Sequence, residues 1–269
     1  MLLPRFGTAA SLVVMALAAP ARAQVPADTT HQPGSPELAL LNNTPPAAGC
    51  AQPFGLLPGK SVEYQLLDAR QKLTGTLRYQ VVSLSAEVKV KKKQPYTVTT
   101  VRLKSGLYDI GNHILQQQDL VVVCKRDTTY TDGLAEINYD GLKSFNTRQF
   151  AYKGKPMAWP NQPTAGSVLP EGGVVVQVSS PSVAIAKVKT TLKNRKLLSG
   201  LVPVAVPAGT FNCYSVESQR ELATAARADL VLKSTGRQVD YYAPNVGIVK
   251  TEYYDKGGKL LQTRVLAKH

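Results

Sequence analysis

The chain has 269 residues, a formal net charge of +14 at pH 7 and 43% hydrophobic residues. This length fits one β-rich domain or two small domains. Of the three histidines, His31 lies in the expected leader and His269 is the last residue, which argues against a histidine-based metal site or a Ser-His-Asp triad. The sequence contains no nucleophile elbow, phosphate loop or Cys-x-x-Cys pair. We therefore expect a protein that is not an enzyme, with no catalytic residues, metal or cofactor.

The N-terminal residues have the pattern of a secretion signal. Arg5 provides a short positive region, Ala9–Ala19 an apolar core, and Ala21-Arg22-Ala23 fits the small-x-small cleavage rule. The expected signal peptide is residues 1–23. A lipoprotein would carry a cysteine directly after the cut, where this chain has Gln24. We expect a soluble exported protein, periplasmic or extracellular, that is not a lipoprotein.

The basic charge suggests partners but does not select one. Loss of the signal peptide lowers the formal net charge to +12, and the remaining lysines and arginines are spread along the chain. Such a balance can favour an anionic envelope surface, with plain solubility as the alternative. No nucleic-acid partner is expected. The densest basic run is Lys89, Lys91, Lys92 and Lys93, which we expect at a hairpin tip.

Residues 24–46 are rich in Pro, Thr, Asn and Ala, so we expect a flexible leader there. Residues 47–269 are expected to form a single antiparallel β domain. Short runs of alternating hydrophobicity between turn residues predict a mainly β fold, either a curved antiparallel sheet or a partly open β-barrel with long loops. The expected strands include Ser61–Leu67, Thr74–Ser83, Tyr96–Lys104, Asp119–Cys124, Gly173–Ser179, Ala184–Leu192, Lys196–Val206, Val246–Tyr254 and Leu260–Leu266.

The connections between these strands are harder to assign. Gly106–Gln118 and Gly133–Lys143 are expected to be irregular or weakly helical. Phe150–Pro170 contains four prolines around Trp159, the only tryptophan, and predicts a long loop over the sheet. Leu222–Leu232 fits either a short helix or a strand.

Two hairpins share a sequence pattern. The stretches that begin at Asp68 and at Asp255 match in their Asp, Lys, Leu and Thr positions, which suggests similar turns. The first stretch has Ala69-Arg70-Gln71 in its turn and lacks a glycine there, so the turn type of the first hairpin is open.

Three cysteines predict one disulfide and one free thiol in an oxidising compartment. Cys213 lies within an expected strand, where a buried thiol behaves as a small hydrophobe. We expect a Cys50–Cys124 disulfide, although the spacing leaves the other pairings open.

Several segments carry a family resemblance. They are Cys50-x-x-Pro53-Phe54, the run from Val204 to Tyr214, and the run from Tyr242 to Lys250. With these, residues 50–268 resemble the TapB-like family of exported bacterial proteins, which is similar to a larger periplasmic group of unknown function. The resemblance implies an antiparallel β fold, as an open barrel. It implies no catalytic residues.

Aromatic residues are the candidate ligand contacts. Tyr242 follows another tyrosine, and Tyr253 and Tyr254 are adjacent, so the members of each pair point to opposite faces of a strand. Trp159 and these three tyrosines could contact a lipid or a sugar; ordinary packing is the alternative. A loose acidic group could offer oxygen ligands to calcium, or could form a solvated connection. Its members are Asp127, Asp132, Glu136 and Asp140.

These observations favour a non-catalytic exported envelope protein that binds a lipid or another apolar or amphipathic envelope component in a curved β-sheet. The alternative is a structural or interaction protein that docks an envelope partner through a basic or aromatic surface. A cavity of several hundred Å³ would support the first reading.

Overall fold

The computed structural model describes residues 50–145, 147–198, 200–227 and 230–269. The expected signal peptide, residues 1–23, and the expected leader, residues 24–46, lie outside the described residues. The single-domain assignment of residues 47–269 stays a prediction. Thr44–His269 form one compact unit by their internal contacts.

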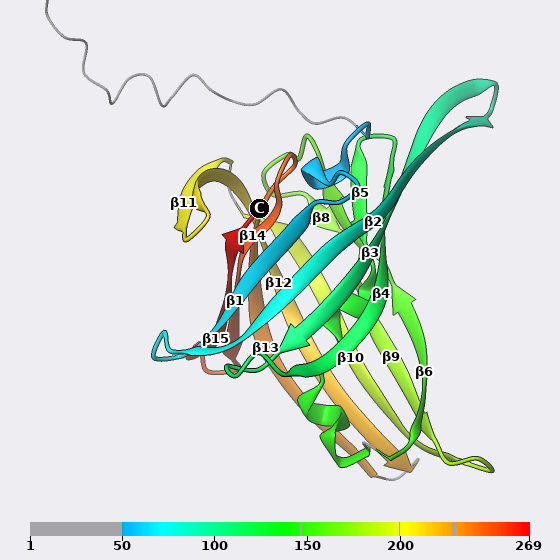
Figure 1. Cartoon of the computed structure of the whole chain (residues 1–269), viewed down its shortest axis with the longest axis vertical. Coiled ribbons are helices and arrows are strands. Elements are labelled where there is room, and N and C mark those ends of the chain that lie inside the picture. Colours follow the sequence, from blue (N-terminus) through cyan, green and yellow to red (C-terminus); the bar gives the residue numbers. More distant parts are fainter. Residues whose placement is uncertain (1–49, 146, 199, 228–229) are drawn as a thin grey trace, which may run out of the picture. The chain divides into compact units, whose positions relative to one another are not determined.

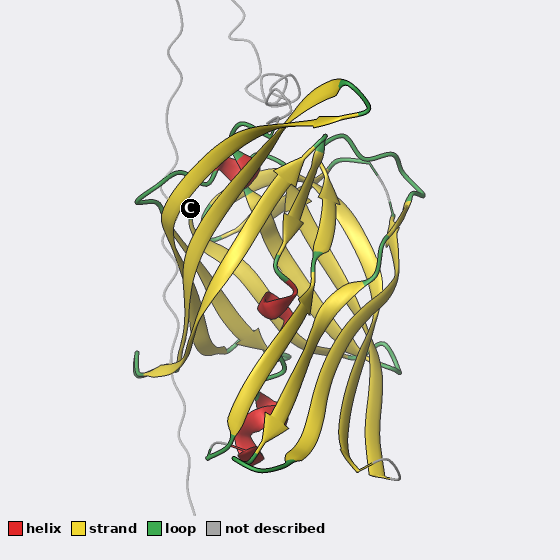
Figure 2. Cartoon of the chain, turned by 90° about the vertical axis from the view of Figure 1, so that its right-hand side faces the viewer, coloured by secondary structure: helices red, strands yellow, loops and turns green. Residues whose placement is uncertain are grey.

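One antiparallel sheet dominates this unit (Figure 1). Its order is β6-β9-β10-β12-β13-β14-β15-β1-β2-β3-β4-β5-β7, with β11 paired to β12 and β8 to β10. Three short 3₁₀ helices accompany it (Figure 2). The elements are η1 (Pro53–Gly55), β1 (Ser61–Asp68), β2 (Leu73–Lys91), β3 (Gln94–Tyr108), β4 (Ile114–Lys125), β5 (Thr128–Thr131), η2 (Gly133–Glu136), η3 (Asp140–Phe145), β6 (Gln149–Lys155), β7 (Met157–Pro160), β8 (Val168–Leu169), β9 (Gly172–Ser179), β10 (Ala184–Leu197), β11 (Val202–Val206), β12 (Gly209–Arg227), β13 (Leu230–Ala243), β14 (Gly247–Asp255) and β15 (Leu260–Lys268).

The sheet curls until it is nearly closed, and this confirms the prediction of a partly open antiparallel barrel. The two edge strands of the order, β6 and β7, follow one another in the chain and do not pair with each other. An unsealed seam remains between them, and η2 packs against β6 and β9 beside it. The barrel therefore has an interior that side chains and η2 fill only in part.

The close approach of η2 to the wall requires glycine. A Cβ atom on Gly133 would lie 2.0 Å from the Gly173 carbonyl oxygen and 2.6 Å from that of Lys155. No side chain fits at that separation, because both obstacles are backbone atoms. Gly133 thus fixes the depth at which η2 enters the barrel.

Three hairpins share one turn. Asp68, Asp109 and Asp255 each donate a backbone N–H to the carbonyl oxygen four residues later, at 2.9 to 3.0 Å. Each aspartate also accepts a backbone N–H of its own turn through Oδ1. The fourth residue of each turn has positive φ: +60° at Gln71, +63° at Asn112 and +82° at Gly258. The expectation that the first and last hairpins have similar turns is confirmed.

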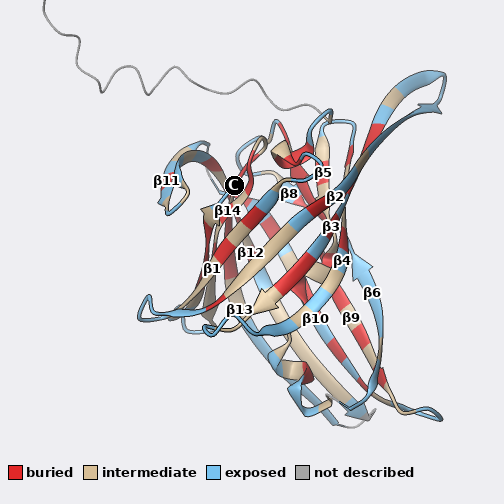
Figure 3. Ribbon diagram, in the orientation of Figure 1, coloured by how far each residue is buried: buried red, intermediate tan, exposed pale blue. Residues whose placement is uncertain are grey.

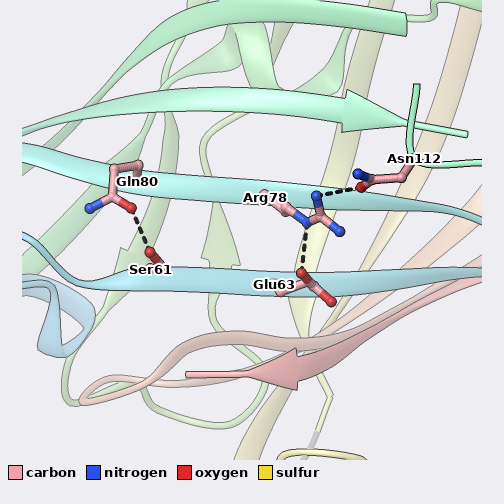
Figure 4. Close-up of polar contacts among 5 residues, drawn as sticks. All are labelled: Ser61, Glu63, Arg78, Gln80 and Asn112. Carbon is pink, nitrogen blue, oxygen red and sulfur yellow. Dashed lines mark hydrogen bonds and ion pairs between the residues drawn. The ribbon is translucent and has the colours of Figure 1, made fainter. Parts of the chain in front are cut away.

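Polar pairs tie the outer face of this region together (Figure 4). Arg78 Nε donates to Glu63 Oε2 at 2.7 Å across the β1–β2 pair. The same guanidinium donates from Nη1 to Asn112 Oδ1 at 2.7 Å, in the β3–β4 turn, and stacks over the Tyr108 ring. These contacts hold the two hairpins side by side.

The buried residues form two clusters. The larger one gathers around Trp159, Tyr242 and Leu266, with Phe54 of η1 closing that end. The smaller one packs Ile137, directly after η2, and Leu142 of η3 against valines of β9 and β10. The interior space left between the clusters is where the candidate site lies.

The cysteines behave as expected. Cys50 and Cys124 form a disulfide that joins the start of the described chain to β4, which confirms the expected pairing. Cys213 is the free thiol and is buried. Burial raises the pKa of its thiol to about 12, so it is neutral and poorly nucleophilic.

Two expectations about connections were wrong. Gly106–Gln118 is not irregular: it completes β3, makes the Asp109 turn and begins β4. Its glutamines concealed the strand, because Gln118 faces the polar interior instead of an apolar core. Phe150–Pro170 is not a long loop, because it contains β6, β7 and β8. Edge strands tolerate proline, since one side of their backbone has no ladder to maintain.

The described residues of the remaining open segment belong to two strands. β12 continues to Arg227, and β13 begins at Leu230. The sequence offered helix or strand for Leu222–Leu232, and pairing with β13 decides the outcome.

The β2–β3 hairpin projects beyond the sheet, and its outer part is exposed (Figures 1 and 3). Lys92 and Lys93 occupy its two-residue turn, as expected from the basic run, and both have positive φ.

Candidate functional site

A cavity of about 620 Å³ occupies one end of the barrel interior. Its walls come from β1–β4, β12, β14 and β15, and from the segment that contains η2 and η3. Its rim includes Asp140 and Lys143, whose side chains are 84% and 78% exposed. The cavity therefore opens to solvent, at the end of the sheet that holds the Asp68 and Asp255 turns.

The deep wall of the cavity is basic. Arg264 of β15 is 7% exposed, and its Nη2 donates to Thr251 Oγ1 at 3.0 Å. Its Nε atom is buried and has no hydrogen-bond partner. Arg220 of β12 lies over the Tyr253 ring at 5.3 Å, and its Nε atom is also buried without a partner. Both arginines line the cavity.

A buried carboxylate lies beside this wall. Asp240 of β13 is 1% exposed and accepts from Thr251 Oγ1 at 2.7 Å and from Gln238 Nε2 at 3.0 Å. Burial and the nearby Glu136 carboxylate raise the pKa of Asp240 to about 6. Thr251 thus bridges Asp240 and Arg264, which form no direct ion pair among the described residues.

Glu136 of η2 faces the arginines from the opposite side of the interior. It is 7% exposed and lines both the large cavity and a second, smaller one. The described residues give its carboxylate no hydrogen-bond donor. Its position follows from Gly133, which lets η2 reach into the barrel.

Tyrosines supply neutral donors around these charges. Burial raises the pKa of Tyr253 to about 12, and burial also raises the pKa of Tyr79. Both hydroxyls stay protonated at neutral pH. The cavity wall can therefore donate hydrogen bonds from tyrosines as well as from arginines.

The second cavity, about 60 Å³ in volume, lies deeper and is mostly apolar. Phe54, Leu56 and Trp159 line it, and it shares Tyr79, Glu136 and Arg264 with the large cavity. The charged residues thus separate a wide space near the mouth from a narrow apolar one.

The structure disperses the four aromatic residues proposed as ligand contacts. Trp159 and Tyr242 pack together in the core, with ring centroids 5.3 Å apart, and the Tyr242 hydroxyl donates to the Pro160 carbonyl. Tyr253 lines the large cavity. Tyr254 lies on the opposite face of β14, under the Arg237 guanidinium at 4.0 Å. Their role in ligand binding stays a prediction, and only Tyr253 lies at the larger cavity.

Sequence reasoning missed Arg264, Arg220 and Glu136. A signal existed for Arg264, which directly precedes the apolar run Val265–Ala267 within an expected strand. A charged residue beside such a run points toward a polar interior. The four acidic residues considered for calcium do not come together: within the described residues, no three His, Cys, Asp or Glu side chains are placed to hold a metal ion.

Arg195 is a second buried arginine, and it has a structural role. It is fully buried, donates to the Pro170 and Ala158 carbonyls at 3.1 Å, and lies 4.7 Å from the Trp159 ring centroid. These contacts fasten β7 and β8 to β10 near the seam.

In the described part of the chain, no helix has the length and apolar character needed to span a membrane.

Comparison with solved structures supports the fold. A candidate lipoprotein from Parabacteroides distasonis ATCC 8503 matches with a TM-score of 0.62 and 22% identity over 80% of this chain and 96% of that one. A candidate exported protein with a YmcC-like fold from Bacteroides fragilis matches with a TM-score of 0.58 and 21% identity, over 81% of this chain and 99% of that one. No curated protein matches significantly.

The family assignment rests on sequence. A family model described as DUF3108-like matches residues 58–266, which include every wall of the large cavity. The narrower resemblance to TapB-like proteins stays a prediction. The chain belongs to the DUF3108-like family.

Proposed function

We propose that the protein is an exported, non-catalytic binding protein that holds an amphipathic envelope molecule inside its curved sheet. The observation that carries this proposal is the open cavity of about 620 Å³, a volume within the usual range for small-molecule sites. Its wall combines leucines with a few buried polar groups, as binding sites for amphipathic molecules require. The secretion signal in residues 1–23 supports export.

The test starts with the mature protein purified under mild conditions from its native envelope. Native mass spectrometry with lipid extraction should find a co-purifying amphipathic molecule at about one per protein, and the stripped protein should take up a fluorescent fatty acid. A clean unliganded mass together with no uptake would overturn the proposal.

A matched pair of variants locates the bound molecule. Leu107→Trp places a large side chain in the cavity and should reduce uptake at least ten-fold. Arg102→Trp adds the same side chain to an exposed position of the same strand and should leave uptake unchanged. Equal uptake by both variants would place the ligand elsewhere.

A second candidate function is docking to an anionic lipid surface through the tip of the β2–β3 hairpin. Val88 and Val90 are each 70% exposed on one face, and Lys89 and Lys91 lie on the other. Lys92 and Lys93 form the turn with φ of +52° and +64°. Asparagine and glycine are favoured at such turn positions, so lysine there is unfavourable for folding, and interaction with an anionic surface would account for it.

Vesicle co-sedimentation tests this second candidate. Vesicles of phosphatidylcholine with phosphatidylglycerol should retain the protein at low salt, and replacing Lys89, Lys91, Lys92 and Lys93 by Gln should abolish retention. The control replaces four exposed lysines elsewhere, Lys153, Lys187, Lys189 and Lys233, by Gln. Equal loss in both variants would show that only net charge matters and would reject the hairpin.

A further inference from the structure

We propose that the molecule held in the large cavity is an anionic amphiphile whose carboxylate or phosphate contacts Arg220 and Arg264, with its apolar tail toward the mouth. This inference rests on the proposed function and specifies its ligand. The ligand has a monoanionic or dianionic head on an apolar chain. Its head lies at the arginines and its chain points toward the mouth of the barrel.

Arg264 has fewer hydrogen-bond acceptors than a buried arginine needs. Arg264 is 7% exposed as a residue, and a buried guanidinium is costly unless acceptors surround it. Arg264 has one acceptor, Thr251 Oγ1, and forms no ion pair with a carboxylate of the described residues. Its Nε atom has no partner and its side chain lines the cavity. An anion in the cavity would supply the missing acceptor.

Arg220 provides the second donor. It lines the same cavity, stacks over Tyr253 at 5.3 Å and forms no ion pair with a carboxylate of the described residues. Tyr253 lies beside Gln262 in the β14–β15 register, and Arg264 is the next inward position on β15. Both guanidiniums therefore line one region of the interior, and a phosphate or carboxylate can accept from more than one arginine.

Asp240 and Glu136 act on Arg264 electrostatically, but among the described residues neither carboxylate accepts a hydrogen bond from Arg220 or Arg264. Asp240 uses its oxygens to accept from Thr251 and Gln238. Glu136 faces the cavity and opposes an anion there. The partnerless buried atoms near the arginines include two that can only donate, Arg220 Nε and Arg264 Nε, one that can only accept, Gln238 Oε1, and the Ser218 hydroxyl, which can do either. The unpaired arginine donors therefore favour a ligand group that carries several hydrogen-bond acceptors.

The order of residues along the strands sets the orientation. On β2, Tyr79 lies deeper than Leu77; on β3, Ser105 lies deeper than Leu107. On β12, Arg220 lies deeper than Leu222. On each strand the polar residue is two positions farther from the mouth than the leucine, so a polar layer lies beneath an apolar layer. A charged head would reach the arginines while its tail contacts the leucines.

The test compares four ligands with the same dodecyl chain: dodecanoic acid, dodecyl phosphate, dodecanol and dodecylamine. Isothermal titration calorimetry on the stripped protein should give the acid or the phosphate at least ten-fold higher affinity than the alcohol. The acid-to-phosphate ratio then distinguishes a fatty-acid ligand from a phospholipid-type ligand.

Variants assign the effect to the residues named. Arg220→Gln should lower the affinity for the acid about ten-fold and leave the alcohol unchanged. Glu136→Gln should raise the affinity for the acid several-fold, because it removes a like charge. The control is Arg237→Gln, since Arg237 also stacks over a tyrosine, Tyr254, but on the outer face and paired with Glu217.

The outcomes distinguish a failure of the anionic-ligand inference from a failure of the proposed binding function. Equal affinity for the acid, the alcohol and the amine, or tightest binding of the amine, would overturn the anionic head and leave a binding protein. No binding of any dodecyl ligand would overturn the proposed function itself. Arg220 is half-buried, so its glutamine variant should fold, and circular dichroism would verify this.

Discussion

At the residue scale, the fourth position of the three aspartate turns shows how the chain tolerates an unfavourable backbone. Gln71, Asn112 and Gly258 all adopt positive φ, a region that disfavours residues with a Cβ atom. Glycine enters it without steric cost, asparagine with little, and glutamine with the most. The aspartate side chain, which accepts backbone N–H groups, holds the turn in each case.

Exchanging the residues between the first and last turns should change stability in opposite directions. Gly258→Gln should lower the free energy of unfolding by about 1 kcal/mol, because glutamine is strained in the left-handed region. Gln71→Gly should raise it by about 0.5 kcal/mol, since relief of strain exceeds the added entropy of the unfolded chain. Urea unfolding of each variant measures both values. Shifts of the same sign in both variants would contradict the explanation.

At the element scale, the seam depends on how closely η2 can approach β6 and β9. Gly133 lies against two backbone carbonyl oxygens, and Gly154 lies opposite the same segment, where a Cβ would come within 2.9 Å of Asp132 Oδ1. Asp132 caps η2 by accepting the Leu134 N–H at 3.0 Å. Glycines on both sides thus let η2 pack closely against β6 and β9 and carry Glu136 inward.

Gly133→Ala should lower the free energy of unfolding by about 2–3 kcal/mol, because the added methyl group overlaps backbone atoms that cannot rotate away. It should also displace Glu136, and therefore change the affinity for dodecanoic acid. Gly200→Ala is the control, since a Cβ there meets no atom within 4 Å. Thermal unfolding compares the two. Similar midpoints for both variants would show that η2 can retreat from the wall without cost.

At the scale of the whole molecule, the barrel interior concentrates its ionisable groups around Asp240. Arg264, Arg195 and Glu136 are the charged residues that act on it electrostatically, and Thr251 and Gln238 contact it directly. The folded state raises the pKa of this carboxyl from its ordinary value of 3.8 to about 6, so the carboxyl binds its proton more tightly when the protein is folded. The contribution of Asp240 to stability should therefore fall as pH rises from about 4 to about 6 and level off above that.

The measurement is the free energy of unfolding in urea between pH 4 and pH 7. Asp240→Asn should flatten the decline over this interval, because asparagine does not titrate. Asp255→Asn, at an exposed turn, serves as the control and should keep the decline. A stability difference between the wild type and Asp240→Asn that does not decrease between pH 4 and pH 6 would contradict the raised pKa of Asp240.

Local patterns in the sequence predicted much of the sheet. Alternation placed β1 and β9 almost to the residue, and the Asp255 hairpin with its two glycines was evident. The site was less predictable, because alternation shows which residues share a face and not whether space remains beside them. Arg264 belongs to a strand of the recognisable Asp255 hairpin, yet its convergence with Arg220 depends on the curvature of the whole sheet. Trp159 was misplaced because prolines on an edge strand resemble prolines in a loop.

The central position of β1 has a consequence for the kinetics of folding. In the strand order, β1–β5 with β7 form one group and β6 with β9–β15 form the other, and only the pairing of β1 with β15 joins the two groups by a ladder. That pairing brings Glu63 opposite Lys268, nearly the full length of the domain apart in sequence. Each group can assemble from neighbouring hairpins, whereas the join must wait for the last strand. The interior, and any cargo within it, is therefore enclosed only after the entire chain has been delivered.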